Sequence, residues 1–177
     1  MKFARACLCL VVAVGCVTSA NAVAQNSAHD RVGPVPPAIL AAKSIFVSNA
    51  GSDSGLFPSP FTGDPDRAYT EFYAELKATG DYQLADDPLQ ADLVLELQLF
   101  APNGPTNPNK INGAADPLPR FRLTVYDRKT HYILWTVTES IEAAGSQKAH
   151  DKTFDQALTE VLNEFLYIAG KTRTPPN

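Results

Sequence analysis

The sequence predicts an α/β two-layer sandwich of the α+β kind, with a mixed sheet of four to five strands and two helices on one face. Several segments alternate apolar and polar residues, and two others carry apolar residues at helical spacing. Within each segment the apolar residues lie on one side only. A sheet buried on one face needs one covering layer, which two amphipathic helices supply. The expected order of elements is β-α-β-β-β-β-α.

The first half of the predicted domain holds three strands and one helix. Residues 43–48 are apolar and β-branched, residues 82–84 form a short strand, and residues 92–100 alternate strictly between leucine and other residues from 93 to 99. The helix is expected to begin with Asp64 as its N-cap and Pro65 in its first turn, and to end at Gly80. The crossover through this helix predicts parallel pairing of the first strands.

The second half is predicted to be a hairpin followed by a long helix. Residues 120–126 and 131–141 are the two strands, and residues 127–130 are the turn between them. The helix is expected from about Asp151 to Ala169, with Gly170 stopping it. The core-facing residues of the hairpin are predicted to be Phe121, Leu123, Val125, Ile133, Trp135, Val137 and Ile141.

The first 24 residues have the pattern of an export signal. Lys2 and Arg5 precede a run of twelve apolar residues, and small residues follow at Ala20 and Ala22. The run is too short to cross a bilayer, and no later segment is long and apolar enough, so we expect no transmembrane span after processing. The expected location is the periplasm or the exterior. The alternative is an outer-membrane lipoprotein acylated at Cys16, because residues 12–16 loosely match a lipobox.

The remaining chain is predicted to be one acidic, cysteine-free domain. Residues 1–24 are the signal peptide, 25–42 a proline-broken linker, 43–170 a single α/β domain and 171–177 a flexible tail. Loss of two of the 15 basic residues with the leader leaves 13 against 19 acidic ones, a net charge of −6. This balance excludes a broad electrostatic grip on nucleic acid. All three cysteines lie in the first sixteen residues, so thiol catalysis and a disulfide scaffold are excluded for the mature chain unless Cys16 survives processing.

Polar residues gather in two long loops, 49–66 and 101–117. If the strands before them run parallel, both loops leave the same edge of the sheet, where open α/β sheets commonly bind ligands. Long loops in a compact domain are often functional, although two proline-stiffened surface loops are the simpler interpretation. The candidate ligand-binding residues are Asn49, Asp53, Asp64, Asp66, Asn103 and Asn107.

The sequence shows no catalytic constellation. The aspartates of the first loop lack the spacing of a calcium-binding loop, and there is no phosphate-binding glycine loop or zinc motif, so we expect no metal and no cofactor. An alternative function is a hydrolase whose carboxylates converge between the two loops. Its candidate residues are Asp53, Asp64, Asp66 and Asp116.

Two segments carry a resemblance to a known group of proteins. Residues 90–97 contain Ala-Asp followed by an apolar strand, and residues 121–135 form an apolar strand, an Asp-x-x-Thr turn and a second apolar strand ending in Trp135. This layout resembles small exported bacterial envelope α/β proteins that are lipoprotein-like, and is similar to the lipopolysaccharide-assembly lipoprotein type. A glycine often follows the turn threonine in that group, whereas this chain has His131. The resemblance implies a binding or assembly role with an envelope protein or a lipid-derived ligand as partner, and it supplies no catalytic residue. The oligomeric state stays open.

Overall fold

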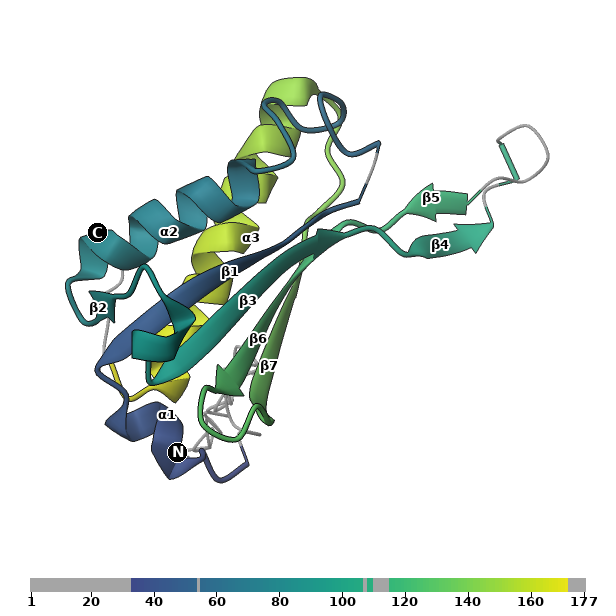
Figure 1. Cartoon of the computed structure of the whole chain (residues 1–177). Coiled ribbons are helices and arrows are strands. Elements are labelled where there is room, and N and C mark those ends of the chain that lie inside the picture. The colour runs from purple at the N-terminus through teal and green to yellow at the C-terminus, as the bar shows by residue number, and fades with distance from the viewer. Residues whose placement is uncertain (1–32, 54, 107, 110–114, 172–177) are drawn as a thin grey trace, which may run out of the picture. The chain divides into compact units, whose positions relative to one another are not determined.

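A computed structural model of the chain describes residues 33–53, 55–106, 108–109 and 115–171. The chain divides into two units, Met1–Gly33 and Pro34–Asn177, and every element below belongs to the second (Figure 1). The short helix α1 (Pro37–Ala41) comes first, inside the range expected as a linker, and its Ile39 is buried in the core. Among the described residues, no helix combines the length and apolar character needed to cross a membrane.

The main sheet is mixed and five-stranded, as predicted. Its order is β2-β1-β3-β6-β7. Strands β1, β2 and β3 run parallel, while β3, β6 and β7 are antiparallel neighbours. The strands are β1 (Ser44–Ser52), β2 (Gln83–Leu84), β3 (Leu93–Phe100), β6 (Arg120–Asp127) and β7 (Ile133–Ser140).

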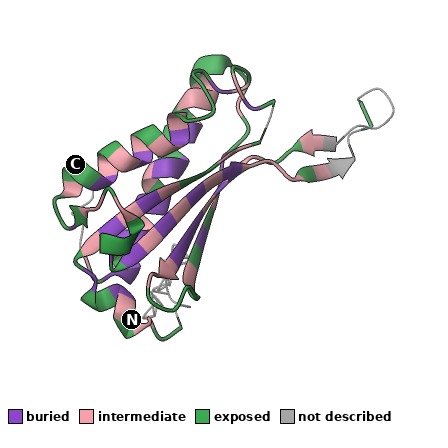
Figure 2. Cartoon of the chain, in the orientation of Figure 1, coloured by how far each residue is buried: buried purple, intermediate pink, exposed green. Residues whose placement is uncertain are grey.

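Two helices cover one face of this sheet (Figure 1). They are α2 (Arg67–Thr79) and α3 (Gln147–Ile168), and the short 3-10 helix η2 (Pro88–Gln90) precedes β3. Buried and half-buried residues alternate along β3, which confirms the predicted one-sided burial (Figure 2). The core therefore fills the space between the sheet and the two helices.

Both helices begin at residues other than those predicted. The N-cap of α2 is Asp66, not Asp64, and the carboxylate of Asp64 instead accepts a hydrogen bond from the Asp66 N–H at 2.9 Å. Asp66 makes no side-chain capping bond, and the Arg67 N–H donates to the Asp64 carbonyl at 3.1 Å. A single turn over residues 64–67, stabilised by the Asp64 side chain, therefore precedes the helix. Helix α3 begins four residues earlier than expected, since the Ser146 hydroxyl accepts a hydrogen bond from the Ala149 N–H.

The predicted face of Ile133 is wrong. The pairing of β6 with β7 shifts register between Val125 and Tyr126, so that Tyr126 lies opposite Ile133. An extra residue at such a bulge moves the following side chain to the other face. Ile133 is consequently 60% exposed, whereas Val137 and Ile141 are buried as predicted.

The conformation of the hairpin turn shows why glycine is common in similar proteins at the position that His131 occupies here. This residue has a φ of 61°, the left-handed conformation that glycine adopts most easily. The carboxylate of Asp127 accepts hydrogen bonds from the N–H groups of Lys129 and Thr130, at 2.7 and 2.9 Å. These bonds hold the turn and lower the pKa of Asp127.

A second hairpin, which the sequence did not predict, projects from the sheet where β3 ends (Figure 1). Its strands are β4 (Asn103–Thr106) and β5 (Ala115–Pro117). At its root, a Cβ atom on Gly104 would lie 2.6 Å from the backbone oxygen of Asp116. Only glycine allows the two strands to approach this closely.

Candidate functional site

The two long loops meet at one edge of the sheet, as the parallel pairing of β1 and β3 requires. Asp53 joins them. Its N–H donates to the Leu99 carbonyl at 3.0 Å, and its Oδ2 accepts a hydrogen bond from the Ala101 N–H at 2.7 Å. The end of β1 is therefore attached to the point where β3 leaves the sheet.

A pocket of about 390 Å³ lies at this junction. Among the described lining residues, Asp53 contributes the one carboxylate, and the other residues have apolar side chains or, at Gly55, none. The described residues that line the pocket are Asp53, Gly55, Leu56, Pro60, Ala101 and Pro117. The first loop supplies most of the wall, and the root of the projecting hairpin supplies the rest.

The first loop is packed into the domain by its aromatic residues. Phe61 is fully buried, and its ring lies 5.0 Å from that of Phe154 on α3. Phe57 lies 6.1 Å from Phe61 and 6.2 Å from Phe154. Such tilted and edge-on arrangements are favourable for aromatic pairs. The loop consequently presents a fixed wall to the pocket.

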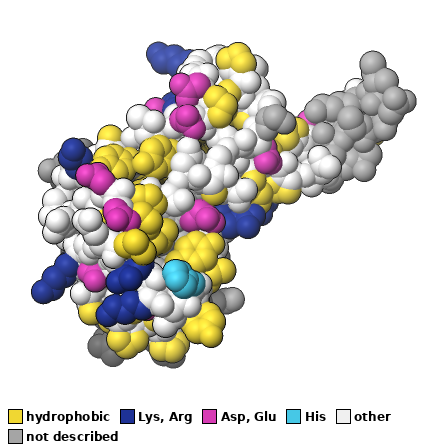
Figure 3. Space-filling view, viewed as in Figure 1, with side chains coloured by type: hydrophobic (Ala, Val, Ile, Leu, Met, Phe, Trp, Pro, Cys, Tyr) yellow, Lys and Arg dark blue, Asp and Glu magenta, His cyan; other side chains and the backbone are white. Residues whose placement is uncertain are grey.

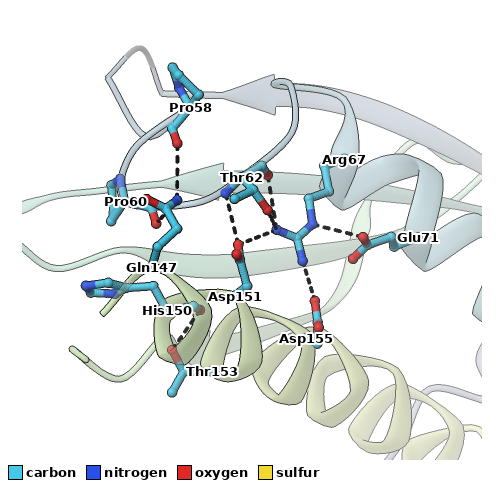
Figure 4. Close-up of polar contacts among 10 residues, drawn as sticks. All are labelled: Pro58, Pro60, Thr62, Arg67, Glu71, Gln147, His150, Asp151, Thr153 and Asp155. Atoms are coloured by element: carbon cyan, nitrogen blue, oxygen red, sulfur yellow. Dashed lines mark hydrogen bonds and ion pairs between the residues drawn. The ribbon is translucent and has the colours of Figure 1, made fainter. Parts of the chain in front are cut away.

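Polar contacts from α2 and α3 hold the same loop from the other side (Figure 4). Gln147 donates to the carbonyls of Pro58 and Pro60, at 3.2 and 2.8 Å. Arg67 donates to the Thr62 carbonyl at 3.1 Å, and the Thr62 N–H donates to Asp151 at 2.9 Å. Each of these contacts joins the loop to a helix.

Arg67 is the centre of this polar cluster. Its guanidinium contacts Asp151 at 2.7 Å, Asp155 at 2.6 Å and Glu71 at 2.9 Å, and it lies over the Phe154 ring at 4.3 Å. Burial acts to lower the pKa of Arg67, but the bonds to Asp151 and Glu71 outweigh it and raise that pKa. The Thr62 N–H and Arg67 together lower the pKa of Asp151. Arg67 and Asp151 are therefore both charged and paired near neutral pH.

Three of the predicted ligand residues bind one another instead of facing the pocket. Asn49 donates to Asp66 at 2.8 Å and accepts a hydrogen bond from the Gly51 N–H at 2.9 Å. Asp64 is engaged with the Asp66 N–H, as described above. These side chains order the chain before α2, a structural role that short polar residues commonly play in turns.

The remaining predicted residues lie in different places. Asp53 lines the pocket, and Asn103 is exposed on β4, where it pairs with Pro117. Asn107 and Cys16 lie outside the described residues. Of the four aspartates in the hydrolase alternative, Asp53 alone is among the described residues that line the pocket. Within the described ranges, no group of three His, Cys, Asp or Glu residues is placed to hold a metal ion.

Sequence reasoning missed the apolar walls of the pocket and the role of Arg67. The sequence holds a usable signal, because Leu56, Phe57 and Phe61 are large apolar residues within the loop of residues 49–66. Apolar residues in a long loop indicate that the loop packs against the domain. Arg67 carried no comparable signal, since its partners at 151 and 155 are remote in sequence.

On the face drawn in Figure 3, acidic and basic side chains are interspersed with hydrophobic patches. The open face of the sheet carries a few specific polar contacts. Tyr126 donates to Glu96 at 3.1 Å, and Arg122 lies 4.3 Å from the centre of the Phe100 ring. Thr124, at the centre of this face, is 5% exposed.

The sequence matches no protein-family model and no curated protein. Among solved structures, the chain is similar to a DUF4136 family protein from Bacteroides thetaiotaomicron, with a TM-score of 0.50 and 14% identity over 75% of this chain and 92% of that one. It also matches a DUF330 protein from Xanthomonas campestris, with a TM-score of 0.47 and 15% identity over 79% and 89% of the two chains. A lipoprotein from Neisseria meningitidis matches with a TM-score of 0.37 and 15% identity over 68% and 99%. These neighbours are bacterial DUF proteins and a lipoprotein, and the likeness to the DUF4136 protein is one of fold alone.

Proposed function

We propose that this chain is an exported protein of the bacterial envelope that acts by binding a partner rather than by catalysis. The observation that carries the proposal is the pocket of about 390 Å³ between the first loop and the root of the β4–β5 hairpin. A concave site of this size accommodates a small ligand or one side chain of a partner. The leader-like residues 1–24 support the location.

The lining favours binding over hydrolysis. Hydrolysis by carboxylates needs a second acid or base close to the first. The carboxylate of Asp53 already accepts the Ala101 N–H, and Gly55, Leu56 and Pro60 contribute no titratable side chain. Among the described lining residues, Asp53 is therefore the one ionisable side chain and stands beside apolar ones, which suits recognition.

The walls are held before any partner arrives. The hydrogen bonds of Gln147 and Arg67 to the first loop, and the burial of Phe61, fix the position of that wall. Asp53 fixes the other side through Ala101. A preorganised site loses less conformational entropy on binding, which increases affinity.

The partner class follows from the location and the lining. An envelope protein or a lipid-derived ligand both present apolar groups with attached polar atoms, which match apolar walls beside one acceptor. Native mass spectrometry of the chain isolated from the envelope is the test. We expect a bound species on the natural chain that is lost from Pro117→Trp, whose indole fills the rim, and retained on Leu89→Trp, which alters an exposed residue outside the pocket lining.

The same spectra test the location. A chain beginning after Ala22 or Ala24 supports export without an anchor, and a chain beginning at an acylated Cys16 supports the lipoprotein alternative. A chain that keeps its first residues would contradict export. Equal binding by the natural chain, Pro117→Trp and Leu89→Trp, or no binding by any of them, would contradict the assignment of the pocket as the binding site.

A further inference from the structure

The two edges of the five-stranded sheet differ in length. At one edge, β2 has two residues. At the other, β7 has eight, and Figure 1 shows it as the last strand of the sheet. A long edge strand presents a row of unpaired backbone N–H and C=O groups that can pair with another strand.

The register identifies which groups point outward. The Ile141 N–H donates to the Pro119 carbonyl at 2.9 Å, which makes these two residues a hydrogen-bonded pair. Hydrogen-bonded pairs alternate along an antiparallel ladder. Because Ser140 lies opposite Arg120, the backbone groups of Ser140, Thr138 and Thr136 point away from β6. Among the strands that the structure describes, none pairs with this side of β7, so these groups form its outer edge.

This edge carries little of the usual protection. Edge strands are commonly protected by proline, lysine, a bulge or a charged residue that points inward. Of these, β7 has one inward charge, Glu139, which lies near Glu160 and Glu164 of α3. Residues 133–140 contain no proline, lysine or arginine, and the register shift lies at the first end of the strand. Thr136 and Thr138 are exposed β-branched residues, which favour strand pairing.

We propose that β7 pairs antiparallel with the β7 of a second copy of this chain, around a two-fold axis near Val137. The two sheets then form one continuous sheet with all four long helices on the same face. Such a contact is isologous, so each copy uses the same strand. The occupant is a second copy because the strand complements itself when it is reversed.

Charge and apolar surface both favour the reversed pairing. Glu139 is the single ionisable residue within 133–140. A parallel pair in register would place two Glu139 side chains opposite each other, whereas the antiparallel pair sends them to opposite ends. Tyr132 is 74% exposed and Ile133 is 60% exposed where β7 begins. With the axis near Val137, reversal places each exposed Ile133 opposite the end of the partner strand.

The test is the mass of the full chain in solution, measured by sedimentation across a hundredfold range of concentration. We expect a dimer for the natural chain and for Thr138→Val, which keeps its backbone N–H. We expect a monomer with an unchanged circular dichroism spectrum for Thr138→Pro, because this proline removes an N–H that points away from β6. A natural chain that stays monomeric, or a Thr138→Pro chain that stays dimeric, overturns the proposal.

A cysteine experiment decides the case in which Thr138→Pro does not fold. Cys7, Cys9 and Cys16 are first replaced by serine, so that an added cysteine is the single thiol. We expect oxidation to give a linked dimer with Thr136→Cys, which lies near the axis, and not with Ala78→Cys, an exposed position on α2. Equal yields of linked dimer from both positions, or no linked dimer from Thr136→Cys, overturn the proposal.

Discussion

Replacement of Arg67 by methionine tests the cluster that holds the first loop. The variant keeps an unbranched side chain of similar reach and removes the guanidinium, whose central carbon lies 4.3 Å from the centre of the Phe154 ring. The side chain of Arg67 is 13% exposed and that of Asp151 is 21% exposed, so this pair is largely shielded from water. The partners Glu71 and Asp155 are 40% and 56% exposed. The loss of stability in Arg67→Met therefore comes mainly from the lost bond between the guanidinium and Asp151.

The magnitude follows from these exposures. A hydrogen bond to a charged group contributes about 1.5 to 3 kcal/mol, and each exposed ion pair contributes a few tenths of a kcal/mol. Asp151 keeps its bond from the Thr62 N–H, which limits the cost of leaving it unpaired. We expect Arg67→Met to lower the free energy of unfolding by about 2 to 3 kcal/mol.

Urea unfolding at neutral pH measures this change. The midpoint should fall by about 1 M while the slope m stays the same, because the surface exposed on unfolding is unchanged. The control is Asp155→Asn, which removes an exposed partner and should change the free energy by less than about 0.5 kcal/mol. A loss below about 0.5 kcal/mol for Arg67→Met would show that the pair of Arg67 and Asp151 does not stabilise the fold.

The pH dependence of the same variant adds a second check. The pKa of Asp151 is lowered in the folded chain, so its stabilising effect is complete above the unfolded pKa of about 3.9 and is lost as pH falls through the folded value. The difference between the natural chain and Arg67→Met should therefore narrow in acid. A difference that stays constant down to about pH 2 contradicts the assignment to Asp151.

Three further predictions concern other elements. Burial, with Glu164 and Glu160 nearby, raises the pKa of Glu139 in the folded chain. Its ionisation therefore costs stability as pH rises from the unfolded to the folded pKa of this residue. Glu139→Gln should raise the free energy of unfolding at pH 7 by about 0.5 kcal/mol or less, with no gain below about pH 4. His131→Gly should stabilise the chain by about 0.5 to 1 kcal/mol in thermal unfolding, because φ is 61° there, and His131→Val should destabilise it; the reverse order would contradict the left-handed turn. Gly104→Ala should speed amide hydrogen exchange in β4 and β5 while leaving β3 protected, since its Cβ meets the Asp116 backbone. An unchanged exchange pattern would show that the two strands are not in close contact.

Much of the fold was predictable because its strands repeat a simple pattern. The alternation in β3 and the apolar stripe of α3 were sufficient to identify a sheet covered on one face. The prediction was wrong where a local contact overrides the pattern. A single bulge moved Ile133 to the open face, and the turn at Asp64 shifted the start of α2.

The candidate site was less predictable for a different reason. Asp53 was identified because polar loop residues at the ends of parallel strands are natural ligand candidates. Asn49 and Asp66, chosen on the same ground, turned out to bond to each other. Whether a polar side chain faces a ligand or its own backbone depends on contacts between distant segments, as with Arg67 and Asp151. No periodic signal in the sequence reports such contacts.

Site-specific photo-cross-linking in the envelope tests the central claim, that the pocket between the two loops is the binding site. A benzophenone amino acid is introduced at Pro117 in the pocket wall or, as the control, at Leu89, which is 70% exposed in η2 and outside the pocket lining. We expect one defined cross-linked product, to an envelope protein or a lipid-derived ligand, from position 117 and none from position 89. The same product from both positions, or no product from position 117, would contradict it.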